Sequence, residues 1–291
     1  MRRLLAALAV LISAALAGPA SADGLRFSTA ISRDGVPINV VEAGERGKPA
    51  ILLIHGFSQS YLSWMAQLQE PELTQRYHLI ALDLRGHGGS GKPWRARDYA
   101  ASRRWADDVD AALQLSGARR PLIVGWSYGG YVALDYLRHR RAGAAAGLML
   151  VGSHAGLLPR PPGGAVPPES DLDAQRAAAR AFMAVMSAAP LSPEATARGE
   201  ASFLMLPPYA RRAFMGRNLD NRDLAPRLAL PIRFLIGEKD PTAAPDALSD
   251  LSAVLPQGAG VAIAPGQGHS PFAEDPAAFA AQLAAFREAV R

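Results

Sequence analysis

Short apolar runs alternate with amphipathic helical stretches along most of this chain. The apolar runs stand at residues 50–54, 78–82, 121–124, 148–151, 232–236 and 260–264. Continuous apolar runs of this length are typical of strands that are buried on both faces of a parallel sheet. The helical stretches between them supply the covering layers. We therefore expect an α/β fold with a mostly parallel central sheet and helices on both faces.

One segment, residues 155–225, departs from this alternation. It begins with a proline- and glycine-rich stretch at 158–164 and continues with helical patterns over about 171–187 and 193–218. We interpret it as a helical cap inserted after the sixth strand, so that the core comprises residues 23–154 and 226–291. The cap holds more apolar side chains than a solvated lid needs. Most should form the cap's own core, and three are expected to line the roof of an apolar substrate pocket: Phe182, Met186 and Phe203.

The sequence Gly-Trp-Ser-Tyr-Gly at residues 125–129 follows the apolar run 121–124 directly and precedes a helical pattern. A strand that turns this sharply into a helix strains the backbone of the central residue and exposes its side chain, which requires small neighbours. Gly125 and Gly129 meet that requirement. The pattern predicts Ser127 as a nucleophile at a helix N-terminus, where negative charge is favoured.

A serine hydroxyl needs a base, and the base needs an orienting acid. Of the six histidines, only His269 lies late in the chain, in a loop between the run 260–264 and a final helix. The acid should fall between nucleophile and base at the end of a strand. Asp240 has that position, and Glu238, its nearest competitor, lies closer to the strand, where it would face solvent. These residues predict a Ser127–His269–Asp240 triad.

Two backbone N–H groups are expected to form an oxyanion hole. Tyr128 follows the nucleophile, and Phe57 lies in the loop after the run 50–54. Each donor is worth roughly 3 kcal/mol in the transition state. The same region should form the pocket floor, which adds Trp64 and Trp126 to the predicted substrate contacts. His154 follows the run 148–151 at the sheet edge where ligands bind; it is a candidate contact, with a non-catalytic loop histidine as the alternative.

In combination, these motifs resemble the α/β-hydrolase family. The landmarks are at residues 34–38 with 42–44, at 55–57, at 83–90, at the serine turn, at 237–240 and at 268–276. The resemblance implies the α/β-hydrolase fold, with Ser127, Asp240 and His269 as nucleophile, acid and base. It is closest to the serine esterase, non-haem haloperoxidase-like and carbon–carbon hydrolase branches. Epoxide hydrolases and haloalkane dehalogenases share many landmarks but carry an aspartate at the turn, so Ser127 argues against both.

The resemblance and the residues together predict an exported serine hydrolase that cleaves an ester, or a related acyl bond, of a small to medium apolar substrate. Carbon–carbon bond hydrolysis, perhydrolysis, amide cleavage at a short N-terminus and lactone opening use the same triad and remain open. A ligand-binding protein on a hydrolase scaffold is the alternative from another class. The charged loop at residues 83–90 is interpreted as structural, held by a local ion pair or hydrogen bonds.

Residues 1–22 read as a secretory signal, with two arginines, an apolar run and a small-residue site. We therefore expect export, to the periplasm or medium of a bacterium, without stable membrane insertion after cleavage; an uncleaved anchor is the alternative. The chain has no cysteine and a formal net charge of +5, with scattered arginines and no aromatic platform for nucleic acid. It contains no metal-ligand cluster, Walker loop or dinucleotide motif, so we expect no cofactor and no nucleic-acid partner.

Overall fold

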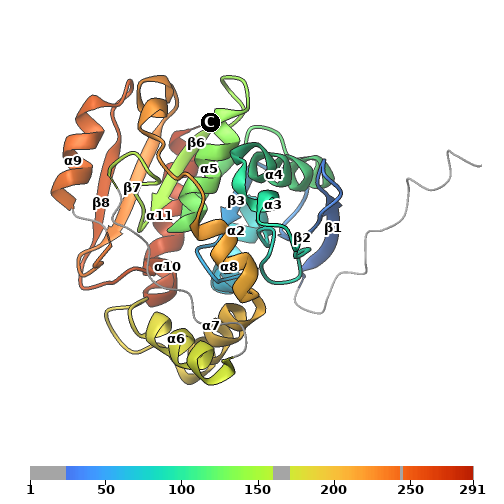
Figure 1. The fold of residues 1–291 in the computed structure, drawn as a ribbon. Coiled ribbons are helices and arrows are strands. Elements are labelled where there is room, and N and C mark those ends of the chain that lie inside the picture. The colour runs from blue at the N-terminus through green and yellow to red at the C-terminus, as the bar shows by residue number, and fades with distance from the viewer. Residues whose placement is uncertain (1–23, 160–170, 243–244, 291) are drawn as a thin grey trace, which may run out of the picture.

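An eight-stranded sheet forms the centre of the protein in the computed structural model, which describes residues 24–159, 171–242 and 245–290 (Figure 1). The strand order is β1-β2-β4-β3-β5-β6-β7-β8. The pairs β1–β2 and β2–β4 are antiparallel and the other pairs are parallel, which confirms the expected mostly parallel sheet. The strands are β1 (Arg26–Ile31), β2 (Pro37–Ala43), β3 (Ala50–Ile54), β4 (His78–Leu82), β5 (Leu122–Trp126), β6 (Gly147–Val151), β7 (Ile232–Gly237) and β8 (Gly260–Ala264).

Helices cover both faces of this sheet, and the central strands are buried on both sides. In β3, Leu52 and Ile54 pack with α4 and α5, while Ile51 and Leu53 pack with α1 and α11 on the opposite face. This alternation explains why the strand reads as an unbroken apolar run. The core helices are η1 (Tyr61–Trp64), α1 (Met65–Leu68), α2 (Pro71–Arg76), α3 (Arg97–Ala100), α4 (Ser102–Ser116), α5 (Tyr128–Arg138), η2 (Arg222–Arg227), α9 (Pro245–Val254), α10 (Pro271–Glu274) and α11 (Pro276–Ala289).

The cap lies between β6 and β7 in the chain, as expected, and consists of α6 (Leu172–Ala184), α7 (Pro193–Met205) and α8 (Pro208–Met215). In Figure 1, α6 and α7 lie together at one end of the molecule, and α8 lies between them and the core. The helical pattern over 193–218 divides into two helices because Pro207 and Pro208 cannot donate backbone hydrogen bonds. Polar contacts join cap to core: the hydroxyls of Ser60 and Ser202 are 2.9 Å apart, and both side chains are buried.

The charged loop after β4 is a structural element, as interpreted, but its partners differ from a local ion pair. Asp83 accepts hydrogen bonds from the backbone N–H groups of Tyr61 (2.7 Å) and Gly89 (2.8 Å). Arg85 instead reaches the distant carboxylates of Asp108 on α4 and Asp34. The carboxylates that hold this loop are separated from Arg85 in sequence, which is why the sequence did not reveal them.

Two buried histidines hold the loop after β3 against the loop after β4. His55 accepts a hydrogen bond from the Leu84 N–H (3.0 Å), and its other ring nitrogen lies 2.8 Å from the Gly56 carbonyl. His87 accepts from the Ser58 N–H (3.2 Å) and its other ring nitrogen faces the Arg85 carbonyl. Each ring therefore carries one proton and is neutral. Burial, and then the neighbouring His55 ring, lowers the pKa of His87 well below its ordinary 6.5.

Residues 1–22, where a secretory signal is expected, lie outside the described residues. Within the part of the chain that the structure describes, no helix is long and apolar enough to cross a bilayer.

The neutral histidines predict a loss of stability in mild acid. Below about pH 6.5 the unfolded chain binds protons on these rings and the folded chain does not. The free energy of unfolding therefore decreases as the pH is lowered, by up to about 1.4 kcal/mol per pH unit for each ring. Urea unfolding between pH 7.5 and 5.5 should therefore show a steeper loss for the parent protein than for His87→Gln. The two proteins share all other titrating groups, so equal slopes would contradict the assignment of a neutral buried His87.

Candidate active site

Ser127 stands in the sharp turn between β5 and α5. Its backbone has φ 50° and ψ −116°, a left-handed conformation that is strained for a residue with a side chain. Its N–H donates to the Val151 carbonyl (2.9 Å), and its own carbonyl accepts from the Ser153 hydroxyl (2.8 Å). The surrounding strands thus fix the backbone of Ser127, while its side chain stays partly exposed.

The two flanking glycines are required by close backbone approach. A Cβ on Gly129 would lie 2.2 Å from the Ile54 carbonyl oxygen, and a Cβ on Gly125 would lie 2.7 Å from the Gly129 carbonyl oxygen. Real Cβ atoms do not approach other atoms this closely. The turn therefore packs directly onto the end of β3, which brings Ser127 beside the loop that carries Phe57.

Asp240 and His269 form a buried pair, as the sequence predicted. His269 Nδ1 lies 3.0 Å and 2.9 Å from the two carboxylate oxygens of Asp240. A carboxylate at this position holds the proton on Nδ1 and leaves Nε2 free to act as a base. Burial alone would raise the pKa of the Asp240 carboxyl, but hydrogen bonds and charge from His269, with hydrogen bonds from Thr242, outweigh burial and lower it. Glu238 instead accepts from the Gly266 N–H at the surface.

Two residues that the sequence analysis did not identify complete this pair. The Thr242 hydroxyl lies 2.8 Å from an Asp240 oxygen and 3.0 Å from His269 Nδ1. Gly152, at the end of β6, has φ +54°, and a Cβ there would lie 2.9 Å from His269 Nδ1 and 3.0 Å from Asp240 Oδ2. The end of β6 thus makes room for the acid–base pair that β7 and the loop after β8 provide.

The loop of His269 lies beside the serine turn. The indole N–H of Trp126, the residue before the nucleophile, donates to the His269 carbonyl (2.9 Å), and the two rings are 5.8 Å apart. Within the described residues no hydrogen bond joins the Ser127 hydroxyl to the His269 ring. Such bonds commonly tighten only when substrate binds, so this arrangement is compatible with proton transfer between them.

The predicted oxyanion donors occupy suitable positions in the backbone. Tyr128 is the first residue of α5 and follows Ser127 directly in the chain. A Cβ on Gly56 would lie 3.2 Å from Ser127 Cβ, so the loop that leads to Phe57 runs directly against the nucleophile. Both amides therefore belong to backbone that borders Ser127.

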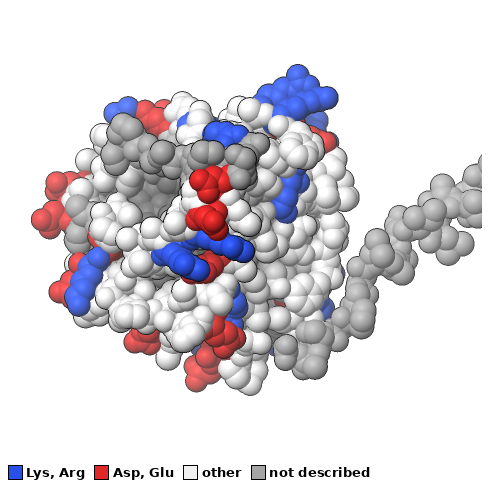
Figure 2. All heavy atoms as spheres, turned by 60° about the horizontal axis from the view of Figure 1, so that its bottom comes forward, with Lys and Arg blue, Asp and Glu red and all other residues white. Residues whose placement is uncertain are grey.

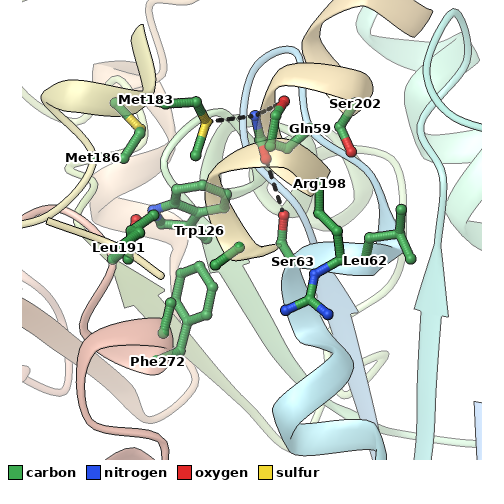
Figure 3. Close-up of a pocket in the computed structure, with 14 residues that line it drawn as sticks. Gln59, Leu62, Ser63, Trp126, Met183, Met186, Leu191, Arg198, Ser202 and Phe272 are labelled. Carbon is green, nitrogen blue, oxygen red and sulfur yellow. Dashed lines mark hydrogen bonds between the residues drawn. The ribbon is translucent and has the colours of Figure 1, made fainter. Parts of the chain in front are cut away.

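A cavity lies between the cap and the core, and Trp126 is among the residues that line it (Figure 3). Trp126 and Ser270, which both line it, are the chain neighbours of Ser127 and His269. Its remaining lining is apolar apart from a few polar groups: Gln59, Leu62, Ser63, Met183, Met186, Leu191, Ala195, Arg198, Gly199, Ser202, Phe272 and Ala273. Gly199 allows α6 and α7 to pack closely here, because a Cβ on it would lie 2.2 Å from Met183 Cε.

Of the predicted pocket residues, Trp126 and Met186 line this cavity. Trp64 does not: it is fully buried and packs on Phe272, with ring centroids 4.5 Å apart. Phe182 and Phe203 pack on each other at 5.4 Å within the cap, although Phe182 also contacts Phe57. His154 faces Tyr131 and is not part of the lining. These positions depend on how the cap helices pack, which helical periodicity does not specify.

Comparison with known proteins identifies relatives across this architecture. Residues 51–282 match the alpha/beta hydrolase family. A candidate aryl esterase from Burkholderia cenocepacia has 32% identity and a TM-score of 0.82, over 91% of this chain and 99% of that chain. An esterase from Rhodococcus sp. ECU1013 has 30% identity and a TM-score of 0.75 over the same shares.

Curated relatives match over a shorter stretch. Epoxide hydrolase A of Mycobacterium tuberculosis is 39% identical over 121 residues, which is 40% of this chain and 37% of that protein. A fluoroacetate dehalogenase from a Burkholderia species is 39% identical over 107 residues, which is 35% of this chain and 34% of that protein. The chain thus aligns with only about a third of the length of these relatives.

The contact between Gly152 and the acid–base pair predicts a selective effect of a single methyl group. Gly152→Ala should lower kcat by about tenfold or more, because the methyl displaces the His269 ring. Gly117→Ala is the matched control, since Gly117 also has a positive φ (+70°) but nothing within 4 Å of its Cβ position. Both variants should lose about 1 kcal/mol of stability through backbone strain. Equal kcat values in ester hydrolysis for the two variants would contradict this role for Gly152.

Proposed function

Because this chain belongs to the alpha/beta hydrolase family, we propose that it is a serine hydrolase that cleaves an ester bond of a small to medium apolar substrate through an acyl-enzyme. The observation that carries this proposal is the strained Ser127 beside the buried Asp240–His269 pair, which lies 2.9 Å apart at its closest atoms. A hydroxyl nucleophile with a carboxylate-oriented imidazole is suited to acyl transfer.

In the proposed reaction, His269 Nε2 takes the proton of the Ser127 hydroxyl as the oxygen attacks the substrate carbonyl. The amides of Phe57 and Tyr128 stabilise the resulting oxyanion. His269 then gives the proton to the leaving alcohol oxygen as the carbon–oxygen bond breaks. Water repeats the sequence on the acyl-enzyme, and the acid is released with a free Ser127 hydroxyl. Asp240 stays ionised throughout and orients the ring, in line with its lowered pKa.

The identity of the nucleophile supports acyl transfer over the activities named for the curated relatives. Epoxide hydrolases and haloalkane dehalogenases resemble this chain in many landmarks but carry an aspartate at the turn, where this chain has Ser127. A serine oxygen that attacked an alkyl carbon would form an ether, which water does not cleave readily, whereas attack on a carbonyl gives an ester that water can hydrolyse. Two esterases match over nine-tenths of this chain at 32% and 30% identity, and cleavage of an ester bond fits a serine nucleophile.

The cavity supports an apolar substrate. Trp126, Met183, Met186, Leu191 and Phe272 give it a mainly hydrophobic lining, and the methionines can adapt to substrates of different shape. On the face that carries α6 and α7, charged residues of both signs are interspersed among uncharged ones (Figure 2). Neither feature favours a highly charged substrate.

Replacement of the nucleophile tests the proposal. Ser127→Ala should reduce hydrolysis of p-nitrophenyl butyrate to the rate of the uncatalysed reaction and abolish labelling by a fluorophosphonate probe, because both require the Ser127 oxygen. Ser116→Ala is the control, since its buried hydroxyl donates to the Leu113 carbonyl at the end of α4. Full activity in Ser127→Ala would overturn the assignment.

A substrate panel distinguishes ester cleavage from the other reactions that this triad supports. The parent protein should hydrolyse short aryl or alkyl esters with a higher kcat/KM than lactones, amides, diketones or a peracid-forming mixture of acid and peroxide. Weak fluorophosphonate labelling without turnover of any of these compounds would instead favour a ligand-binding role, because a misaligned serine reacts poorly with the probe.

A further inference from the structure

Arg217 is a fully buried arginine at the point where the cap returns to the core, two residues after α8 ends. Its side chain is 1% exposed. A guanidinium is rarely buried unless carboxylates, hydrogen bonds or aromatic rings compensate for its lost hydration. The groups that contact the Arg217 side chain therefore indicate which parts of the structure it holds in place.

The partners of Arg217 lie on the helix that carries the nucleophile. Its Nη1 donates to the Tyr128 hydroxyl (2.8 Å), and its Nη2 pairs with the Asp135 carboxylate. Burial raises the pKa of Asp135 to about 6, so this carboxylate is ionised at neutral pH. Tyr128 and Asp135 are seven residues apart on α5 and share one face of the helix. One side chain from the cap thus contacts the first turn of α5 and a position two turns further along.

The same end of the cap also contacts the other predicted oxyanion residue. The Phe214 ring lies 5.0 Å from the Phe57 ring and 4.5 Å from the Tyr128 ring, and the Arg217 guanidinium lies 4.5 Å from the Trp105 ring. The side chains of both proposed oxyanion donors are therefore packed against one short stretch that leaves the cap.

From these contacts we propose that Arg217 is a positioning residue that fixes the first turn of α5, and with it the Tyr128 amide, against the nucleophile. This inference rests on the proposed function, in which that amide binds the oxyanion. Such donors act only when they are held close to the place where charge develops, so a small displacement of α5 lowers the rate without removing any reacting group. The cap thereby contributes to catalysis as well as to the shape of the cavity.

The double variant Arg217→Met/Asp135→Leu separates positioning from simple support. An apolar pair of similar volume commonly preserves stability in place of a buried ion pair. We expect a melting temperature close to that of the parent, a fall in kcat of about tenfold or more and a change in KM of less than about threefold, because the lost interaction acts in the transition state. A double variant that folds and retains the kcat of the parent overturns the proposal.

An inhibitor that mimics the tetrahedral intermediate provides a readout that altered stability does not move. An aryl trifluoromethyl ketone should add to Ser127 and place an oxyanion against the two amides. Its inhibition constant should rise in the double variant by about the same factor as kcat falls. An unchanged inhibition constant contradicts the proposal.

Two further variants keep the test decisive. Arg138→Met is the matched control, because Arg138 joins the other end of α5 to Asp223 and Asn221 without touching Tyr128. Arg138→Met should retain the kcat of the parent, and a fall in its kcat equal to that of the double variant overturns the specific role of Arg217.

If the double variant does not fold, Tyr128→Phe removes one Arg217 contact with little change in volume. A parallel fall in kcat and inhibitor affinity supports the proposal, and no change in either overturns it. Activity in Ser127→Ala would instead refute the proposed function itself.

Discussion

The close packing of the serine turn against the end of β3 is the constraint on which the active site depends. With no side chain on Gly129, this backbone meets the Ile54 carbonyl oxygen, and the strained conformation of Ser127 persists because the Val151 carbonyl and the Ser153 hydroxyl bind it on both sides. Strain of this kind survives only where the surroundings over-determine it. The parallel sheet supplies those surroundings, since the ends of β3, β5 and β6 meet at one edge.

Sheet topology also assembles the other parts of the site. Asp240 and His269 follow β7 and β8, which are neighbouring strands that end at the same edge of the sheet. Gly152, in the turn after β6, has no side chain and so leaves room for both groups. Residues more than a hundred positions from Ser127 therefore lie at the same sheet edge as Ser127 without any long-range specificity in their own sequence. The order of the strands brings these residues to one edge of the sheet, so the loops need only carry the appropriate side chains.

The sequence indicated the six parallel strands β3 to β8 through unbroken apolar runs and a helical insertion between β6 and β7 through a break in the strand–helix alternation, and it placed Asp240 and His269 after strands whose ends the structure brings together. It was less successful where packing decides. Trp64 is a core residue, and Phe182 and Phe203 pack on each other, with Phe182 also against Phe57, because the sequence shows that a residue is apolar but not which neighbour it meets. Arg217 gave no local signal, because its partners belong to the core, and the position of Thr242 two residues after Asp240 does not show that its hydroxyl also lies next to His269.

The contact between Gly199 and Met183 has a consequence for how such an enzyme diversifies. The Met183 thioether borders the cavity and occupies the space that the side chain of a larger residue at position 199 would need. It also contacts the Gln59 side-chain amide. A thioether side chain is flexible, so a slightly larger residue at position 199 on α7 would move the Met183 side chain and change the shape of the cavity. A larger residue at this helical crossing would therefore change the cavity, while Ser127, Asp240 and His269 lie on separate elements and keep their positions.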